Sequence, residues 1–210
     1  MNKKILKALI LPSVVILVPI LVGLILWEQL PQQIPTHWNV AGEVDGWSSK
    51  AFAVFGMPLI FLGVQWLCAL VTRADPKRNN HSDKILHLVF WIIPIVLVVL
   101  SAITYATALG RVVPVEVVMP VLLGLVFTII GNYLPKCKQN YTIGIKIAWT
   151  LSSEENWNKT HRFAGRLWVV CGLVIILTGF FGVFWTFAVI GILMVLAPLI
   201  YSYSLYRKGV

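Results

Sequence analysis

The sequence predicts an all-α polytopic membrane protein with six transmembrane helices and both termini in the cytoplasm. Three observations predict it. Of the 210 residues, 59% are hydrophobic and only 12% are charged, against roughly 25% charged residues in an ordinary soluble domain. The apolar residues are gathered into runs of about 20 or more, the length that a helix needs to cross a bilayer. Nearly all basic residues lie at the two ends of the chain or in every second segment that connects these runs.

Six apolar stretches are long enough to be spans. Four run over residues 5–30, 51–71, 85–109 and 112–134, and the stretch 165–206 holds the last two, with a turn near 182–186. The first is too long for the apolar region of a signal peptide and lacks a cleavage site, so we expect it to be retained. Several prolines inside the spans predict kinks whose freed carbonyls are satisfied by neighbouring helices. These are Pro12, Pro19, Pro94, Pro120 and Pro198.

The charge distribution predicts the orientation. With the amino terminus inside, 15 of the 17 basic residues lie in cytoplasmic segments, and only Lys50 and Arg111 lie outside. Basic residues beside a span are retained on the cytoplasmic side, and this assignment requires an even number of spans. The net charge of +9 is therefore interpreted as topological, and no direct nucleic-acid binding is predicted.

The order of spans and loops predicts three parts. Residues 1–72 form an amino-terminal two-helix module around an outer loop at 31–50. Residues 73–110 form a cytoplasmic loop and the third span. Residues 111–210 form a carboxyl-terminal module with a cytoplasmic loop at 135–163.

The cytoplasmic loop at 135–163 is the longest polar interval of the chain, and its second half predicts a helix. Ser152 and Glu155 fit a capping box with Ser152 as the N-cap. The helix would continue into the fifth span and place Trp157, His161 and Trp168 on roughly one stripe. Trp157 and His161 are then either interfacial anchors at headgroup depth or part of a site.

The first half of this loop predicts an ordered backbone folded against the bundle. Gly131 and Gly144 allow close backbone approach or positive φ. Asn132 lies at the end of the fourth span, where an unpaired amide is costly, so we expect it to bond a neighbouring helix or the loop backbone.

The outer loop at 31–50 is rich in turn residues. His37, Glu43 and Asp45 lie close together but lack the spacing of a structured metal motif, so neither a metal nor another cofactor is predicted. The alternative interpretation is a compact lid with Trp38 and Trp47 buried against the outer headgroups. The three cysteines have no paired spacing, which predicts neither a disulfide framework nor a zinc site.

The cytoplasmic loop resembles the signature of the SdpI/YfhL family. The resemblance is carried by Gly131-Asn132, by residues 140–151 (NYTIGIKIAWTL) and by residues 157–165 (WNKTHRFAG). The family pattern usually reads Arg-Thr-Pro-Trp-Thr-Leu where this chain has Lys146-Ile147-Ala148 before Trp149. The outer loop, with its pattern PxxIPxHWNxxGxxDxW, is similar to an amino-terminal module of unknown function found in the same family.

The resemblance implies an integral protein of the bacterial cell membrane, without enzymatic activity, that gives immunity to a secreted membrane-active toxin peptide. It also implies a receptor that sequesters an autorepressor of the ArsR type. The toxin-facing candidates are in the outer loop: His37, Trp38, Asn39, Glu43, Asp45 and Trp47. The family-motif candidates for docking a cytoplasmic partner are Asn132, Asn140, Gly144, Lys146, Trp149, Thr150, Trp157, Thr160, His161 and Arg162.

Two other functional classes remain open alternatives. A transporter or channel needs ionisable residues facing the bundle interior, whereas Glu28, Arg73 and Glu116 lie near span ends. A membrane-embedded hydrolase would use Glu154, Glu155 and His161, in faint similarity to prenyl-processing proteases. That chemistry needs further His and Asn ligands on other spans, which the sequence does not offer.

Overall fold

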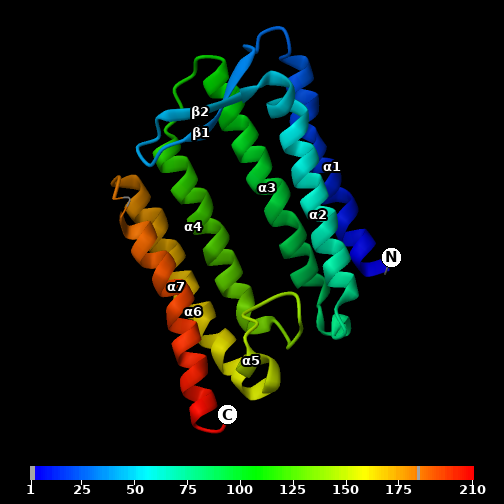
Figure 1. The fold of residues 1–210 in the computed structure, drawn as a ribbon, viewed down its shortest axis with the longest axis vertical. Helices are drawn as coiled ribbons and strands as arrows, with labels where there is room; N and C mark the ends of the chain where they lie inside the picture. The colour runs from blue at the N-terminus through cyan, green and yellow to red at the C-terminus, as the bar shows by residue number, and fades with distance from the viewer. Residues whose placement is uncertain (1–2, 184) are drawn as a thin grey trace. The chain divides into compact units, whose positions relative to one another are not determined.

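The computed structural model describes residues 3–183 and 185–210 and is predominantly helical (Figure 1). The chain divides into two compact units. One consists of Met1–Arg73 with Leu86–Glu116, and the other of Ala74–Ile85 with Val117–Val210. The short segment Ala74–Ile85, between the second and third long helices, therefore groups with the carboxyl-terminal residues.

Six long apolar helices, each long enough to cross a bilayer, are present in the described part of the chain, which confirms the prediction. They are α1 (Lys3–Ile25), α2 (Met57–Ala74), α3 (Asp83–Ala108), α4 (Val115–Tyr133), α6 (Glu154–Phe180) and α7 (Trp185–Arg207). Short elements accompany them: a π-helical turn η1 (Phe52–Gly56) before α2, the 3-10 turns η2 (Arg78–Asn80) and η3 (Leu134–Lys136), and a one-turn helix α5 (Ala148–Ser152).

The helices α6 and α7 pack against each other and form an antiparallel hairpin (Figure 1). Gly182 lies in the turn between them with φ +65°, a conformation that favours glycine. The turn was predicted at 182–186, and residue 184 of that range lies outside the described residues.

The outer loop forms a β-hairpin, which the all-α prediction did not include. Strand β1 (Gln33–Trp38) pairs antiparallel with β2 (Val44–Ser49), and the hairpin lies between the end of α1 and the start of η1 (Figure 1). Its turn is built by Asn39, whose side-chain oxygen accepts the backbone N–H groups of Ala41 and Glu43 at 2.9 and 3.0 Å. Such local bonds to an Asn side chain favour a turn.

One side chain anchors the hairpin to the helices of its unit. Ile34 is fully buried and packs in a cluster with Leu30, Ala53, Val54 and Tyr105. Burial of one strand face fixes the register of the pair. The opposite face of the hairpin is left exposed.

Lys50, a basic residue that the charge pattern places outside, closes the end of α1. It is only 7% exposed, and its Nζ donates to the carbonyl oxygens of Trp27 and Leu30, each at 2.9 Å. The ammonium also lies 4.7 Å from the centre of the Trp27 ring. Both carbonyls belong to the turn that follows α1, where backbone acceptors lack the regular partners of a helix.

Two prolines inside helices confirm the predicted satisfaction of freed carbonyls. Proline has no N–H for the carbonyl four residues earlier. Upstream of Pro94 that carbonyl belongs to Phe90, and it accepts the side-chain N–H of Gln65 at 2.8 Å. Upstream of Pro198 it belongs to Met194, and it accepts the indole N–H of Trp168 at 3.0 Å.

Replacing Trp168 by Phe is expected to lower the free energy of unfolding by about 0.6–1.7 kcal/mol, the range for hydrogen bonds between membrane helices. The change keeps an aromatic ring against Phe127 but leaves the Met194 carbonyl without its donor. Denaturation of the purified protein in mixed micelles measures it. Trp66→Phe, at a side chain that is 39% exposed, is the control, and equal losses in the two variants would contradict the assignment.

Glycines form the contact between α4 and α6. A Cβ added to Gly131 would lie 2.8 Å from the Gly165 carbonyl oxygen, and one added to Gly124 would lie 2.6 Å from that of Gly172. Real Cβ atoms do not approach so closely, so the two backbones touch along a seam of small residues. The predicted close approach at Gly131 is confirmed.

Candidate functional site

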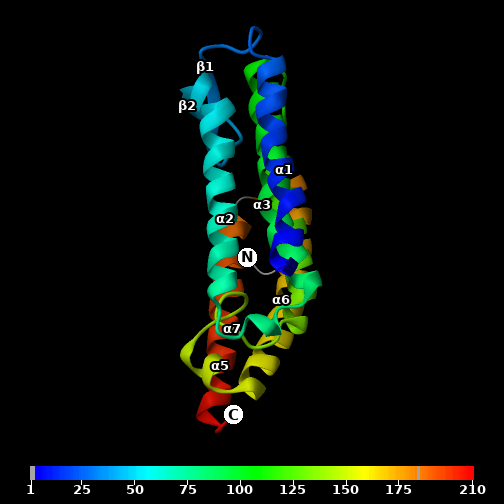
Figure 2. The same ribbon diagram turned by 90° about the vertical axis from the view of Figure 1, so that its right-hand side faces the viewer.

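The polar side chains of the carboxyl-terminal unit are concentrated in two segments that bind each other. One is the α2–α3 turn, residues 75–82, and the other is the motif loop, residues 137–147. Figure 2 shows the motif loop leading into α5, near the carboxyl end of α7. The motif loop has almost no regular secondary structure, so side chains must satisfy its backbone groups.

Asp75 is the centre of the contact between the two segments. Its side chain is 0% exposed. Oδ2 accepts the Tyr141 N–H and the Thr142 hydroxyl, each at 2.9 Å, and it lies 3.2 Å from His81 Nε2. Oδ1 accepts the Lys77 N–H at 2.7 Å. We call Asp75, His81, Tyr141 and Thr142 the Asp75 network.

The electrostatics of the Asp75 network favour an ionised carboxylate beside a neutral imidazole. Burial raises the pKa of the Asp75 carboxyl, but the hydrogen bonds from Lys77, Thr142 and Tyr141 and the attraction of His81 outweigh it, so the pKa lies below its ordinary value. Burial lowers the pKa of His81 more than Asp75 raises it. Neutral His81 can then donate Nε2–H to the carboxylate.

Gln139 joins the α2–α3 turn to α5. Its backbone carbonyl accepts the Asn80 side-chain N–H at 2.7 Å, and its side-chain oxygen accepts from the Lys77 ammonium. Its side-chain N–H groups donate to the carbonyls of Thr150 and Leu151 at 2.9 and 3.1 Å. One residue therefore ties three segments together.

Two motif residues shape the loop itself. The side-chain oxygen of Asn140 accepts the backbone N–H groups of Thr142 and Ile143 at 2.8 and 2.6 Å. Thr150 accepts the Ile147 N–H at 3.1 Å and donates to the Ile145 carbonyl at 2.8 Å. Asn140 is 1% exposed and Thr150 is 0% exposed, so both act within the fold.

Trp157 and His161 hold the loop against α6. The Trp157 indole donates to the Cys137 carbonyl at 2.7 Å. His161 Nδ1 donates to the Trp157 carbonyl at 2.8 Å, so Nε2 is free to accept the Ile145 N–H at 3.0 Å. The two rings stack with centres 4.0 Å apart. Both residues are buried, so the interpretation of them as interfacial anchors is wrong.

The contact between Ile145 and His161 requires a glycine at position 144. Its φ is +123°, and an added Cβ would lie 2.5 Å from His161 Nε2. A side chain at this position would displace the Ile145 N–H from His161. The expected positive φ at Gly144 is confirmed.

The start of α6 differs from the predicted capping box by one residue. Ser153, not Ser152, is the N-cap, and its hydroxyl accepts the Asn156 N–H at 3.1 Å. Asn156 is fully buried. Its side chain donates to the Ser202 carbonyl at 3.0 Å and accepts the Ser202 hydroxyl at 2.6 Å and the Thr160 hydroxyl at 3.1 Å. This contact with α7 fixes where α6 begins.

The remaining motif candidates are at the surface. Lys146 and Arg162 are exposed, and Trp149 is half-buried. Trp149 packs on Tyr203 and Tyr206 of α7, with ring centres 5.4 and 6.0 Å apart. Asn132, which was expected to bond a helix or the loop, has an exposed side chain instead. Because this amide is exposed, it is not an unpaired polar group in the protein interior.

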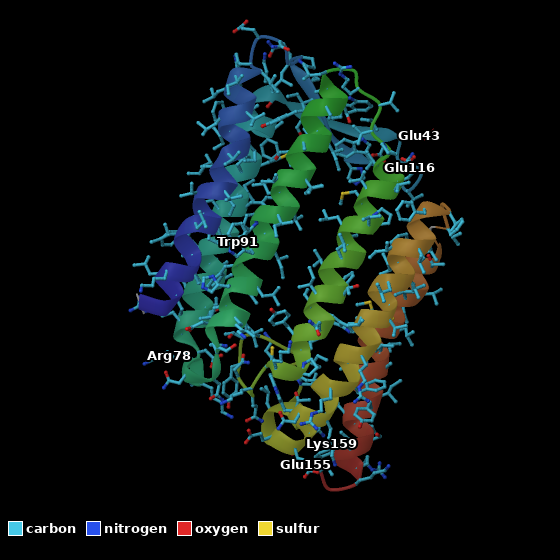
Figure 3. All side chains as sticks on the ribbon, turned by 180° about the vertical axis from the view of Figure 1, so that it is seen from behind. Glu43, Arg78, Trp91, Glu116, Glu155 and Lys159 are labelled. Carbon is cyan, nitrogen blue, oxygen red and sulfur yellow. The ribbon has the colours of Figure 1, made fainter. Side chains whose placement is uncertain are left out.

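The hairpin brings the toxin-facing candidates to one exposed surface. His37 Nδ1 lies 2.5 Å from Asp45 Oδ1, and the Asn39 side chain donates to Glu43 at 3.0 Å. Within the protein, Trp47 is 58% exposed, whereas Trp38 is half-buried. Figure 3 shows Glu43 close to Glu116, the first acidic residue of α4.

Sequence reasoning missed the residues that matter most to the loop: Asp75, Gln139, Asn156 and Ser202. An Asp placed directly after an apolar span was the one available signal, because a carboxylate there must find donors. The arrangement is a structural framework with an exposed basic and aromatic margin, and within the described residues no group of three or more His, Cys, Asp or Glu could hold a metal ion.

Comparison with known proteins matches two stretches of the chain, one with the motif loop and the other with the hairpin. Residues 136–202, which hold the motif loop and α5 to α7, match the SdpI/YfhL protein family, and residues 14–62, which hold the hairpin, match a domain of unknown function called DUF1648. The chain is 28% identical to the immunity protein SdpI of Bacillus subtilis (strain 168) over 205 residues, covering 96% of this chain and 97% of that protein. No solved structure matches it.

Proposed function

We propose that this chain, a multi-span membrane protein that belongs to the SdpI/YfhL family, protects a bacterium against a secreted membrane-active toxin peptide. The observation that carries the proposal is the similarity to an immunity protein over 96% of the chain. That similarity includes both the hairpin and the motif loop, so it covers the two polar regions of the molecule.

The charge distribution supports the orientation that this function needs. Fifteen of the 17 basic residues lie in segments that the positive-inside rule assigns to the cytoplasm. Both termini and the motif loop are then cytoplasmic, and the hairpin faces the medium. A peptide that arrives from outside meets the hairpin first.

The exposed hairpin face is the contact surface we propose for the peptide. It presents Trp47, which is 58% exposed, and Val40, which is 76% exposed. Asp45 and Glu43 lie beside them, whereas the nearby cation Lys50 is buried and committed to the end of α1. Aromatic side chains with free faces are frequent anchors of binding surfaces, and the acidic groups favour a peptide with basic residues.

Trp47→Ala is expected to abolish most of the protection while leaving the protein in the membrane, because its side chain contributes contact area rather than packing. The measurement is the survival of a sensitive strain that expresses the protein and is challenged with toxin peptide. The toxin dose that the cells survive should fall by about tenfold, which corresponds to the loss of one anchor side chain. Tyr206→Ala, at an aromatic residue that is 54% exposed on α7, is the matched control. Absence of protection by the unmodified protein against every peptide tested would overturn the proposed function.

We also propose that an ArsR-type repressor docks on the cytoplasmic side. The exposed motif residues Lys146, Trp149 and Arg162 support this, together with the aromatic contact of Trp149 with α7. The buried motif residues are left with a structural role. Retention of a tagged repressor by membranes that contain the wild-type protein, and its release by a Lys146→Glu and Arg162→Glu double variant, is the expected result.

A further inference from the structure

We propose that the α2–α3 turn controls the motif loop: the Asp75 network holds the loop closed, and its release frees residues 141–143. The turn would then determine which motif-loop groups a cytoplasmic partner can reach. The proposal rests on the contacts of residues within one compact unit.

The Asp75 network behaves as a single contact that is either complete or broken. A buried carboxylate is costly unless donors surround it, and Asp75 receives four contacts within 3.2 Å with its side chain 0% exposed. If Tyr141 and Thr142 move away, the carboxylate keeps its charge but loses two donors. Partial opening is therefore unfavourable, which gives the loop two discrete arrangements.

The other side of the motif loop is held independently. Trp157 and His161 bind Cys137 and Ile145, the two flanks of the loop, and neither contacts Asp75. Loss of the Asp75 network should thus free only the central residues. Asn140 keeps its local bonds to Thr142 and Ile143, so the freed segment moves as a turn.

That a cytoplasmic partner meets the freed groups rests on the proposed function, whereas the release of the loop does not.

Hydrogen–deuterium exchange of the full-length protein in nanodiscs tests the control of the loop without any toxin. Asp75→Asn keeps the shape of the side chain but presents an amide to the Tyr141 and Thr142 donors. We expect exchange in a peptide covering residues 139–143 to rise by about tenfold or more, as for loss of a protected closed state. Exchange in α6 should stay unchanged. Thr142→Val, which removes one donor, should give a smaller rise at the same residues.

The control variant is Glu155→Gln, which also removes one negative charge. Glu155 lies on α6, is 63% exposed and pairs with Lys159 at 2.7 Å (Figure 3). Unchanged exchange at 139–143 in both Asp75→Asn and Thr142→Val would overturn the proposal, and so would an equal rise in Glu155→Gln. Faster exchange throughout α6 would assign Asp75 to global stability and would overturn it as well.

Survival of cells that express the wild-type protein, challenged with toxin peptide, keeps the two proposals separate. A loop that opens in Asp75→Asn, in a protein that gives no protection, would retain the control of the loop and overturn the proposed function. Protection by a protein whose exchange at 139–143 is unchanged in both Asp75→Asn and Thr142→Val would retain the proposed function and overturn the control of the loop.

Discussion

Trp157→Ala is expected to lower the free energy of unfolding by about 3–5 kcal/mol, the usual cost of removing a large aromatic side chain from a core. Trp157 is 0% exposed. The change removes the ring that stacks on His161 and leaves the Cys137 carbonyl without its donor. His161 would keep its bond to the backbone carbonyl of residue 157 but lose the ring stacked on it. The motif loop thus loses one of its two hydrogen bonds with α6 and the packing beside the other.

Denaturation in mixed micelles measures the loss, and Trp47→Ala is the control because both variants delete an indole. Trp47 is 58% exposed, and substitutions at such positions usually change stability by less than about 0.5 kcal/mol. The two variants should therefore separate the functions of the two tryptophans: the Trp157 variant unfolds easily, and the Trp47 variant is stable but unprotective. A stable Trp157→Ala protein with an ordered loop would contradict the role given to this residue.

The spans were predictable because a bilayer imposes a length and a composition that can be read locally. The prolines were predictable to the same degree: each marks a carbonyl that needs a donor. The donors themselves were not predictable. Gln65 lies 25 residues from Phe90, and Trp168 lies 26 residues from Met194, so only the packing of helices brings them together.

The hairpin was missed because the outer loop has weak strand signals. Strand β2 reads Val-Asp-Gly-Trp-Ser-Ser, in which Asp, Gly and Ser have low strand propensity. The hairpin is stabilised by contacts with the rest of its unit, through Ile34 of β1 in the core and through Lys50, which bonds the turn after α1. The turn at Asn39 and Gly42 was visible in the sequence, but a turn alone does not distinguish a hairpin from an irregular loop.

The sequence predicted which segment holds the candidate site, but it did not predict which residues contact each other there. The motif identified the correct segment, yet Asp75 is 67 residues from Thr142, and no local pattern connects them. The one-residue error at the start of α6 has the same origin. Ser152 and Ser153 are both acceptable caps, and the contact of Asn156 with Ser202 decides between them.

Gly172→Ala is expected to destabilise the carboxyl-terminal unit by about 1–3 kcal/mol, the cost of adding a methyl group to a packed interface. The new Cβ would lie 2.6 Å from the Gly124 carbonyl oxygen and would also meet the Thr128 side chain. The Gly124 oxygen belongs to the backbone of α4, so it cannot rotate away. The two helices must separate, and the contact between Gly131 and Gly165 farther along the same seam weakens with them.

Gly191→Ala decides whether this effect comes from the seam or from the general response of a helix to alanine. Gly191 lies in α7, and an added Cβ there meets nothing within 4 Å. Alanine is preferred to glycine in a helix by about 0.5–1 kcal/mol, so this variant should be as stable as the wild type or more stable. Denaturation in the same micelles should show a lower free energy of unfolding for Gly172→Ala and an equal or higher one for Gly191→Ala. Equal stabilisation by both substitutions would mean that α4 and α6 do not touch at Gly172.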